Sequence, residues 1–363
     1  MATYGGPARG PVRPARRRGV PVPYVLALLA ASAVVVVAVV GVVRADAGRP
    51  DAAAAPSTSA VTLAFAGDVH FEGSSAAALD DGLGQAAQVL AAADLAVVNL
   101  EAAVTTGGNR QPKQYAFRAP ARAFTALADA GVDAVSMANN HGMDYGRAGL
   151  IDSLAAARAA KVAVVGAGAD DAAAFAPLRR TVRGVKVSVF AATDVLDSFA
   201  VTSWPAAPQR PGLAAVKDAG LARLADAVRA EKAGGAARRA DVVVVMTHWG
   251  VERRTCPTTR QEEVARVLAE AGADAVVGSH AHVLQPQTTV GSTLVAYGLG
   301  NFVFYAKGGA AVQSGVLTVT VTGAGVRGST WAPAVIRAGR PVLLTGADKA
   351  AAARAQEERG TAC

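Results

Sequence analysis

All five histidines of the chain lie in four short segments whose composition suits a metal site. They are His70 in Gly-Asp-Val-His, His141 in Asn-Asn-His, His248 in Thr-His-Trp-Gly, and His280 and His282 in Ser-His-Ala-His. Neutral imidazole is the commonest protein ligand for borderline divalent metals, and Asp and Asn oxygens complete such sites. These residue types therefore predict a metal centre before any fold is assigned.

Each of these motifs follows a short apolar run of the kind that forms a buried strand. The runs are 61–66, 132–136, 242–246 and 275–277, and a similar run over 94–99 leads into Asn99 and Glu101. In open α/β sheets, the carboxyl ends of the strands share one crevice where ligands bind. One histidine in such a place is more often a hydrogen-bonded structural residue than a ligand. Five of them at equivalent strand ends favour a metal site.

Short β-type runs alternate with longer helical runs, which predicts one α/β domain over 61–340. Strands are predicted at 61–66, 94–99, 132–136, 162–165, 185–191, 241–246, 274–277, 293–297, 315–322 and 328–336. Helices are predicted at 75–92, 121–130, 146–160, 213–232 and 259–271. Residues 341–363 are predicted to be a C-terminal tail.

Residues 22–43 are uncharged and almost wholly apolar, which is about the length that a helix needs to cross a bilayer. Five arginines precede them within the first 18 residues, so the N-terminus is predicted to be cytoplasmic and the domain outside the membrane. Residues 1–21 are then a disordered basic head and 44–60 a linker. The alternative is a cleaved signal peptide with a site at Ala45-Asp46-Ala47, but its apolar region usually has only about 7–15 residues. A single-pass signal anchor in the cell membrane is therefore favoured.

The net charge of +8 is concentrated in the N-terminal head. Residues 1–50 hold seven arginines against one aspartate, so they contribute 7 − 1 = +6, and the remainder contributes only +2. The remainder has no basic stripe interleaved with aromatic residues, so nucleic acid is not an expected partner.

The two cysteines, Cys256 and Cys363, suit an oxidising exterior. Neither lies in a Cys-x-x-Cys motif, which argues against a zinc finger. Their spacing does not decide between one disulfide and two free thiols.

The order of the motifs, Asp-x-His, Asn-His, an isolated His and His-x-His, resembles the calcineurin-type dinuclear metallophosphoesterases. Within that superfamily the chain is most similar to the CapA family, which is linked to poly-γ-glutamate capsule synthesis. The resembling segments span about 65–304, and they are 65–70, 99–101, 139–146, 248–252, 278–286 and 297–304. The resemblance implies an α/β/β/α sandwich as the fold.

The resemblance also implies roles for individual residues. One metal would be held by Asp68, His70 and His282, and a second by Asn140, His248 and His280. The superfamily takes its bridging carboxylate from a Gly-Asp-x-x-Asp turn, which this chain lacks, so Glu101 is the predicted replacement. His141 would be a non-ligand imidazole that protonates a leaving group.

Mixed nitrogen and oxygen ligands without thiolate suit one or two ions of Mn, Fe or Zn. Two metals about 3.5–4 Å apart can clamp the attacking and leaving oxygens of a displacement.

Several further residues are candidates for the surroundings of the site, each with a plain structural alternative. Asp144 would orient His141 or cap the helix that begins near Gly146. Arg118 would meet an anionic substrate or remain a solvated surface residue. The other candidates, for lining the site or for packing and turns, are Asn99, Trp249, Glu252 and Asn301.

The predicted function is that of a membrane-anchored, extracytoplasmic hydrolase that depends on divalent metal. It would act in the synthesis, export or remodelling of a poly-γ-glutamate-type capsule or another cell-surface polyanion. Its partners would be an anionic polymer or cell-envelope substrate and a membrane capsule synthase complex. The missing Gly-Asp-x-x-Asp turn motivates the alternative, a non-catalytic surface module that binds the polymer or the synthase.

Overall fold

The computed structural model describes residues 57–235 and 239–363. The predicted basic head, the predicted membrane helix over 22–43 and the linker up to residue 56 lie outside these residues. Among the residues that are described, no helix is both long enough and apolar enough to cross a bilayer.

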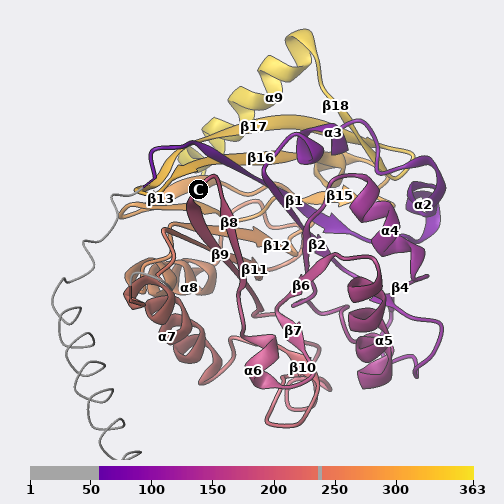
Figure 1. Cartoon of the computed structure of the whole chain (residues 1–363). Helices are drawn as coiled ribbons and strands as arrows, with labels where there is room; N and C mark the ends of the chain where they lie inside the picture. Colours follow the sequence, from indigo (N-terminus) through magenta and orange to yellow (C-terminus); the bar gives the residue numbers. More distant parts are fainter. Residues whose placement is uncertain (1–56, 236–238) are drawn as a thin grey trace, which may run out of the picture. The chain divides into compact units, whose positions relative to one another are not determined.

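The first of the two main sheets has the strand order β18-β17-β16-β1-β2-β5-β6, and β15 also pairs with β1 (Figure 1). Its strands are β1 (Val61–Val69), β2 (Leu95–Leu100), β5 (Ala134–Ser136), β6 (Ala163–Val165), β15 (Asn301–Val303), β16 (Gln313–Thr322), β17 (Gly325–Arg337) and β18 (Arg340–Leu343). The central strands β1, β2, β5 and β6 run parallel, whereas β16, β17 and β18 are antiparallel.

The second main sheet has the order β13-β14-β12-β11-β9-β8. Its strands are β8 (Leu178–Val182), β9 (Val185–Thr193), β11 (Val242–His248), β12 (Ala275–Ser279), β13 (Gln287–Val290) and β14 (Thr293–Ala296). Two short pairs lie apart from these sheets, and they are β3 (Ala103–Val104) with β4 (Arg118–Ala119), and β7 (Ala167–Gly168) with β10 (Gly212–Leu213). All ten predicted strands correspond to strands of the structure, with ends that differ by a few residues.

The alternation of side chains along β1 shows how the layers form. Leu63 and Phe65 pack between the two sheets, while Ala64 and Ala66 face the other way, toward helices. A strand that is buried on both faces must be apolar throughout, which explains the continuous apolar runs. The described domain is therefore built as helices, sheet, sheet and helices, an α/β fold with largely parallel central strands (Figure 1).

The helices cover the outer faces of the two sheets. On the first sheet these are α2 (Ala78–Asp81), α3 (Ala87–Ala91), α4 (Arg122–Asp129) and α5 (Gly146–Ala159). On the second sheet they are α7 (Gly220–Ala233) and α8 (Thr259–Glu270). The remaining short segments are α6 (Asp171–Ala174), η1 (Gly73–Ala77) and η2 (Gly309–Val312).

Two of the predicted helices are wrong in extent. The predicted helix over 75–92 is broken into η1, α2 and α3, because Gly82 and Gly84 have φ angles of 79° and 94°. A Cβ on Gly84 would lie 2.6 Å from the carbonyl oxygen of Pro341, so the break also allows a close approach to β18. The predicted helix over 213–232 begins only at Gly220, since Leu213 pairs in β10.

Residues 341–363, predicted as a tail, contain most of β18, the helix α9 (Gly346–Glu358) and the turn η3 (Arg359–Thr361). Gln356 is the buried residue of α9, and its Nε2 donates to the carbonyl oxygen of Gln285 at 2.9 Å. Because α9 buries so little, its sequence carries no amphipathic signal. The structure joins Cys256 and Cys363 in a disulfide with a Cα–Cα distance of 5.4 Å, which decides the question that the spacing left open.

We expect Cys363→Ser to lower the free energy of unfolding by about 2–4 kcal/mol. The disulfide links residues 107 positions apart, so it restricts the unfolded chain over a long loop. Urea titration under non-reducing conditions measures the loss. Cys256→Ser and the double variant should lose the same amount, because either single change already breaks the bond. A double variant with twice the loss, or a single variant as stable as the parent, contradicts this account.

Candidate functional site

The predicted site residues meet where the carboxyl ends of the parallel strands of the two sheets lie next to each other. Within the first sheet Asp68 is in register with Asn99, and within the second His248 is in register with Ser279. Contacts then cross between the sheets. Asn99 Nδ2 lies 3.2 Å from His248 Nδ1, and the backbone N–H of His280 donates to Asp68 Oδ2 at 3.3 Å. Tertiary packing therefore gathers residues that are more than 200 positions apart in the sequence, as Asp68 and His280 are.

Gly67, the first residue of the Gly-Asp-Val-His motif, allows β15 to approach β1. A Cβ at this position would lie 1.8 Å from the carbonyl oxygen of Gly300. The same carbonyl accepts a hydrogen bond of 3.0 Å from the backbone of Asp68, and Asp68 is in parallel register with Asn301. The glycine therefore helps to bring Asn301 to the site.

Two groups of side chains have the composition and spacing to hold a metal ion, and both contain Glu101. One consists of Glu101, His248 and His280, and the other of Asp68, Glu101 and His282. Within each group the ligand atoms lie within 4.8 Å of one another. Asn140 lies beside the first group, with its Oδ1 2.8 Å from His248 Nε2. A carboxylate common to both groups has the position of a bridging ligand, the role predicted for Glu101.

The donor atoms of these groups fit a cation. Both carboxylate oxygens of Glu101, Nδ1 of His280 and Nε2 of His70 are buried and have no hydrogen-bond partner among the described residues. A buried polar atom left without a partner costs about 1–3 kcal/mol. Divalent metal ligation would satisfy such atoms, and the mixture of imidazole and carboxylate suits Mn, Fe or Zn.

The electrostatics of the metal-free site point the same way. Burial and the negative charge of Asp68 raise the pKa of Glu101 well above its usual range. Burial and the charge of His282 lower the pKa of His280 to about 3, and burial lowers that of His248 as well. Both imidazoles are therefore neutral, which is the form that binds metal.

His282 behaves differently from the other histidines. Burial alone would lower its pKa, but the charge of Glu101 and a hydrogen bond to Asp68 outweigh burial and raise it to about 10. Its Nδ1 lies 3.1 Å from Asp68 Oδ2 and 2.9 Å from Asn301 Oδ1. In the absence of metal, a proton on His282 therefore supplies positive charge to the carboxylates.

The His-x-His turn is strained in the way that functional turns often are. His280 and His282 have φ angles of 90° and 54°, in the region that favours glycine. Such conformations cost on the order of 1–3 kcal/mol each and persist only where the surroundings impose them. Here the turn places both imidazoles beside Glu101.

The structure does not bring His70 into either ligand group. The backbone N–H of Glu72 donates to His70 Nδ1 at 3.1 Å, and Ser75 Oγ lies 3.1 Å from the same atom. The ring packs against Phe304, with their centroids 4.0 Å apart. Its unpartnered Nε2 remains the atom available to a ligand.

His141 lies beside the ligand groups without belonging to them. Its Nε2 is 4.0 Å from Glu101 Oε1, and its ring stacks on Phe117 with a centroid distance of 4.2 Å. Its Nδ1 lies 2.6 Å from Asp144 Oδ2. Of the two roles considered for Asp144, the structure therefore shows contact with His141, whereas Tyr145 occupies the cap of α5 without a side-chain hydrogen bond.

The remaining predicted residues divide between the site and its surroundings. Asn99 donates to Asp68 Oδ1 at 2.9 Å. Trp249 is buried in the core beneath α7 and α8, where its Nε1 donates to the carbonyl oxygen of Tyr297. Arg118 lies over the ring of Tyr145, in a different cavity from His141. Neither Trp249 nor Arg118 is therefore brought together with the ligand groups.

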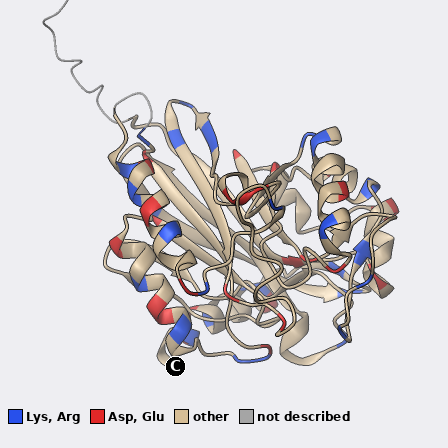
Figure 2. Ribbon diagram, turned by 90° about the horizontal axis from the view of Figure 1, so that it is seen from below, with Lys and Arg blue, Asp and Glu red and all other residues tan. Residues whose placement is uncertain are grey.

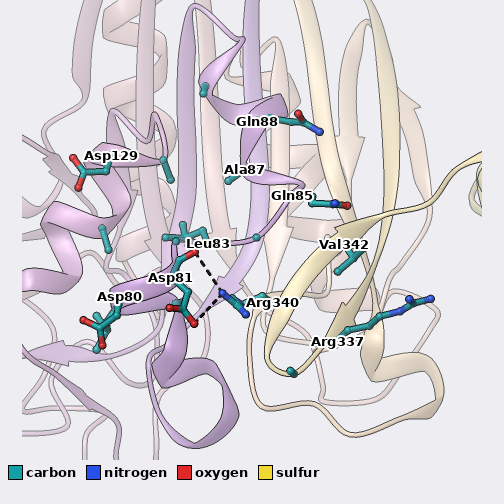
Figure 3. Close-up of a pocket in the computed structure, with 18 residues that line it drawn as sticks. Asp80, Asp81, Leu83, Gln85, Ala87, Gln88, Asp129, Arg337, Arg340 and Val342 are labelled. Atoms are coloured by element: carbon teal, nitrogen blue, oxygen red, sulfur yellow. Dashed lines mark hydrogen bonds and ion pairs between the residues drawn. The ribbon is translucent and has the colours of Figure 1, made fainter.

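A cavity of about 620 Å³ opens onto the ligand groups. His141, His282, Asn301 and Glu252 contribute to its lining. A larger cavity of about 860 Å³ lies elsewhere, between α2, α3 and β18, and Figure 3 shows that its lining contains the ion pair of Arg340 with Asp81 but no histidine. The smaller cavity is therefore the candidate substrate pocket, since it alone of the two reaches the ligand groups.

Lys113 is a site residue that the sequence did not reveal. Its side chain is only 7% exposed, and its Nζ lies 3.1 Å from Asp144 Oδ1 and 2.8 Å from Asp197 Oδ2. The same ammonium donates to the carbonyl oxygen of Asn140. No local pattern marks it, because it lies in an irregular segment between β3 and β4.

Asn139 lies in the Asn-Asn-His motif, but the sequence assigned it no role in the site. It is fully buried, its Oδ1 accepts from the backbone of His141, and its Nδ2 donates to Asn99 Oδ1 and the carbonyl oxygen of Leu100. It thus joins the Asn-Asn-His turn to the end of β2. In the sequence, its position next to Asn140 and His141 is what could have indicated a role for it in the site.

Comparison with known proteins places this chain in a family. The family model described as bacterial capsule synthesis protein PGA_cap matches residues 62–306. The chain is 36% identical to the capsule biosynthesis protein CapA of Bacillus anthracis over 49% of this chain and 42% of that protein. It is 32% identical to the PGA biosynthesis protein CapA of Bacillus subtilis over 60% of this chain and 54% of that protein. The chain therefore spans about half the length of the curated relatives it matches.

Among solved structures, one described as a novel phosphatase from Mycoplasma pneumoniae overlaps 76% of this chain and 94% of its own. The sequence identity is 16% and the TM-score 0.48. An overlap this weak says nothing about the chemistry of the chain.

We expect metal-free Glu101→Gln to be more stable than the metal-free parent at pH 8, by at least about 1 kcal/mol. The raised pKa means that the folded protein holds this proton more tightly than the unfolded chain. That contribution is present below the ordinary value of 4.5 and is lost as the pH rises through the folded pKa. The difference should therefore shrink as the pH falls to 4.5.

Denaturant titration in a chelating buffer at several pH values measures this difference. Added Mn²⁺ should then stabilise the parent and not the variant. A variant less stable than the parent at pH 8, or equally stabilised by Mn²⁺, contradicts the shared-carboxylate geometry.

We expect Lys113→Met to lower the free energy of unfolding by about 3 kcal/mol, because it leaves the buried Asp144 without its cation. Lys349→Met on the exposed surface of α9 is the matched control and should change stability by less than about 0.5 kcal/mol. Thermal and urea unfolding measure both variants. Equal stability of the two would show that Lys113 does not hold the Asn140-His141 turn.

Proposed function

Because the chain belongs to the bacterial capsule synthesis protein family PGA_cap, we propose that it is a divalent-metal-dependent hydrolase. It acts in the synthesis, export or remodelling of a poly-γ-glutamate-type capsule or another cell-surface polyanion. The names of the two Bacillus relatives, which refer to capsule biosynthesis and PGA biosynthesis, support the assignment to capsule metabolism. Its partners in this proposal are the anionic polymer and a membrane synthase complex.

The observation that carries the hydrolase proposal is the carboxylate of Glu101, which is common to two groups of ligand atoms. Asp68 and His282 would complete one metal site, and His248, His280 and Asn140 the other. When bound, the metals would supply Lewis acidity and lower the pKa of water to give a nucleophile near neutral pH.

The protein's own contribution is a proton donor held in place. His141 lies next to Glu101, and Asp144 fixes its ring through Nδ1. Nε2 is thereby left to face the ligand groups, and when the ring is doubly protonated it carries the proton that a leaving group on an amide or a phosphoester would take. Stacking on Phe117 restricts the ring further.

The proposal places the domain outside the cell membrane, with residues 22–43 as its anchor. The disulfide between Cys256 and Cys363 supports an oxidising compartment, because such bonds are rare where thiols are kept reduced. The arginine-rich head supports an N-terminus on the cytoplasmic side.

The test is purification of the full-length chain, measurement of bound metal, and assay on phosphodiester and γ-glutamyl substrates beside His280→Ala. We expect up to two divalent ions per chain and turnover of one substrate class. His280→Ala should bind less metal and turn over substrate at least about a hundredfold more slowly, because it removes one ligand from the group of Glu101, His248 and His280. Arg254→Gln, an exposed change outside the pocket, is the control and should keep both properties. Metal-free protein that does not respond to His280→Ala would overturn the proposal.

One observation favours a second candidate, a binding module without turnover. The Gly-Asp-x-x-Asp turn of the superfamily is replaced here by Asn99-Leu100-Glu101. Complementation of a strain lacking the gene separates the two functions. A His141→Ala protein that still supports capsule formation indicates binding, and loss of the capsule indicates turnover.

A further inference from the structure

Three charged side chains line the candidate substrate pocket without a charged partner. They are Glu252, Arg253 and Lys307, and they share the pocket with His141 and His282. In residues 57–235 and 239–363, none of the three makes an ion pair or a side-chain hydrogen bond. All three are exposed, so they are available to a ligand.

The backbone holds Arg253 in place beside the ligand groups. Its N–H donates to the carbonyl oxygen of Ala281, the residue between the two histidines of the His-x-His turn, at 2.7 Å. Its φ angle is 64°, in the left-handed region that non-glycine residues rarely adopt. Its position is therefore imposed by the turn that also positions His280 and His282.

The other two charges come from different directions. Lys307 follows β15, on the segment that enters η2, whereas Glu252 and Arg253 follow β11. Glu252 is close enough to the ligand groups for its charge to act on His282 and Glu101. The pocket thus presents one carboxylate and two cations. Elsewhere in the described domain, residues of both signs of charge are distributed along the ribbon (Figure 2).

This combination does not suit the interior of a uniform polyanion. Arg253 and Lys307 would attract its carboxylates, but Glu252 would repel them. In a γ-linked glutamate chain, an internal residue offers only its α-carboxylate. The amino-terminal residue offers an ammonium and a carboxylate on one carbon. Such a zwitterion matches all three side chains.

We propose that Glu252, Arg253 and Lys307 form a subsite for the zwitterionic amino-terminal residue of a carboxylate-bearing polymer. The inference rests on the proposed function and extends it, because the protein then engages chain ends and not the chain interior. Glu252 receives the terminal ammonium, and the two cations receive the carboxylate on the same carbon.

The test compares two probes on the full-length, Mn²⁺-loaded protein. These are a short γ-linked glutamate oligomer with a free amino terminus and the same oligomer with an acetylated amino terminus. Titration calorimetry should show that the free oligomer binds about fivefold to tenfold more tightly, since acetylation removes one charge contact.

Variants assign the preference to the named side chains. Glu252→Gln should bind both oligomers with the affinity that the parent has for the acetylated one. Arg253→Gln and Lys307→Gln should each lower the affinity for both oligomers about fivefold, because both oligomers retain the carboxylate that the two cations bind. The matched controls are Arg254→Gln and Glu357→Gln, which are exposed and lie outside the pocket. Both should leave the affinities and the metal content unchanged.

The outcomes separate this inference from the proposed function. A parent protein that binds or hydrolyses both oligomers equally overturns the subsite and leaves the hydrolase proposal standing. The subsite is also overturned if Glu252→Gln keeps the preference for the free amino terminus. A metal-loaded parent that neither binds nor hydrolyses either oligomer overturns the proposed polymer, and the subsite with it.

Discussion

The arrangement of this domain depends on the burial of two carboxylates next to each other. Asp68 and Glu101 are both fully buried, and burial together with the charge of Asp68 raises the pKa of Glu101. A pair of this kind is tolerated in a low-dielectric interior only when cations or hydrogen-bond donors surround it. The protein supplies the donors through Asn99, His280 and His282, and the unpartnered oxygens of Glu101 point to metal. The strand ends of the two sheets therefore meet around Asp68 and Glu101, where the ligand groups lie.

Much of the surrounding structure keeps these charged groups at fixed positions. Asn139 joins the end of β2 to the turn that carries His141, and Lys113 joins that same turn to Asp144 and Asp197. On the other sheet, Trp249 packs against the segment that precedes the His-x-His turn. A Cβ on Gly278 would lie 2.2 Å from Trp249 Nε1, so the indole can occupy this position only beside a glycine. Backbone conformations such as those of His280 and His282 persist only where the surrounding structure imposes them.

Family membership and site geometry support each other without being the same observation. The resemblance read from the motifs is confirmed by the family model over residues 62–306. The geometry adds which side chains meet: Glu101 belongs to both ligand groups, His141 lies beside them, and three charged side chains line the pocket. The match covers only about half of the curated relatives, so the names of those proteins do not establish an activity for this chain.

The sequence by itself determined the strands, the strand-end motifs and the family. These are local properties, because a strand buried on both faces must be apolar along its whole length and its polar residues appear where it ends. The order of the motifs also predicted Glu101 as a bridging ligand, and the structure places its carboxylate in both ligand groups.

Only the tertiary structure decided which side chains share one space. In the structure, Arg118 and Trp249 lie away from the ligand groups, whereas Lys113 reaches Asp144 from an irregular segment. Cys256 and Cys363 form a disulfide. The tertiary structure also breaks the helix predicted over 75–92 at two glycines, one of which makes room for β18. Each of these outcomes depends on contacts between residues far apart in the chain. The direction of a side chain in a loop, unlike the period of a strand, is set by such contacts and not by its sequence neighbours.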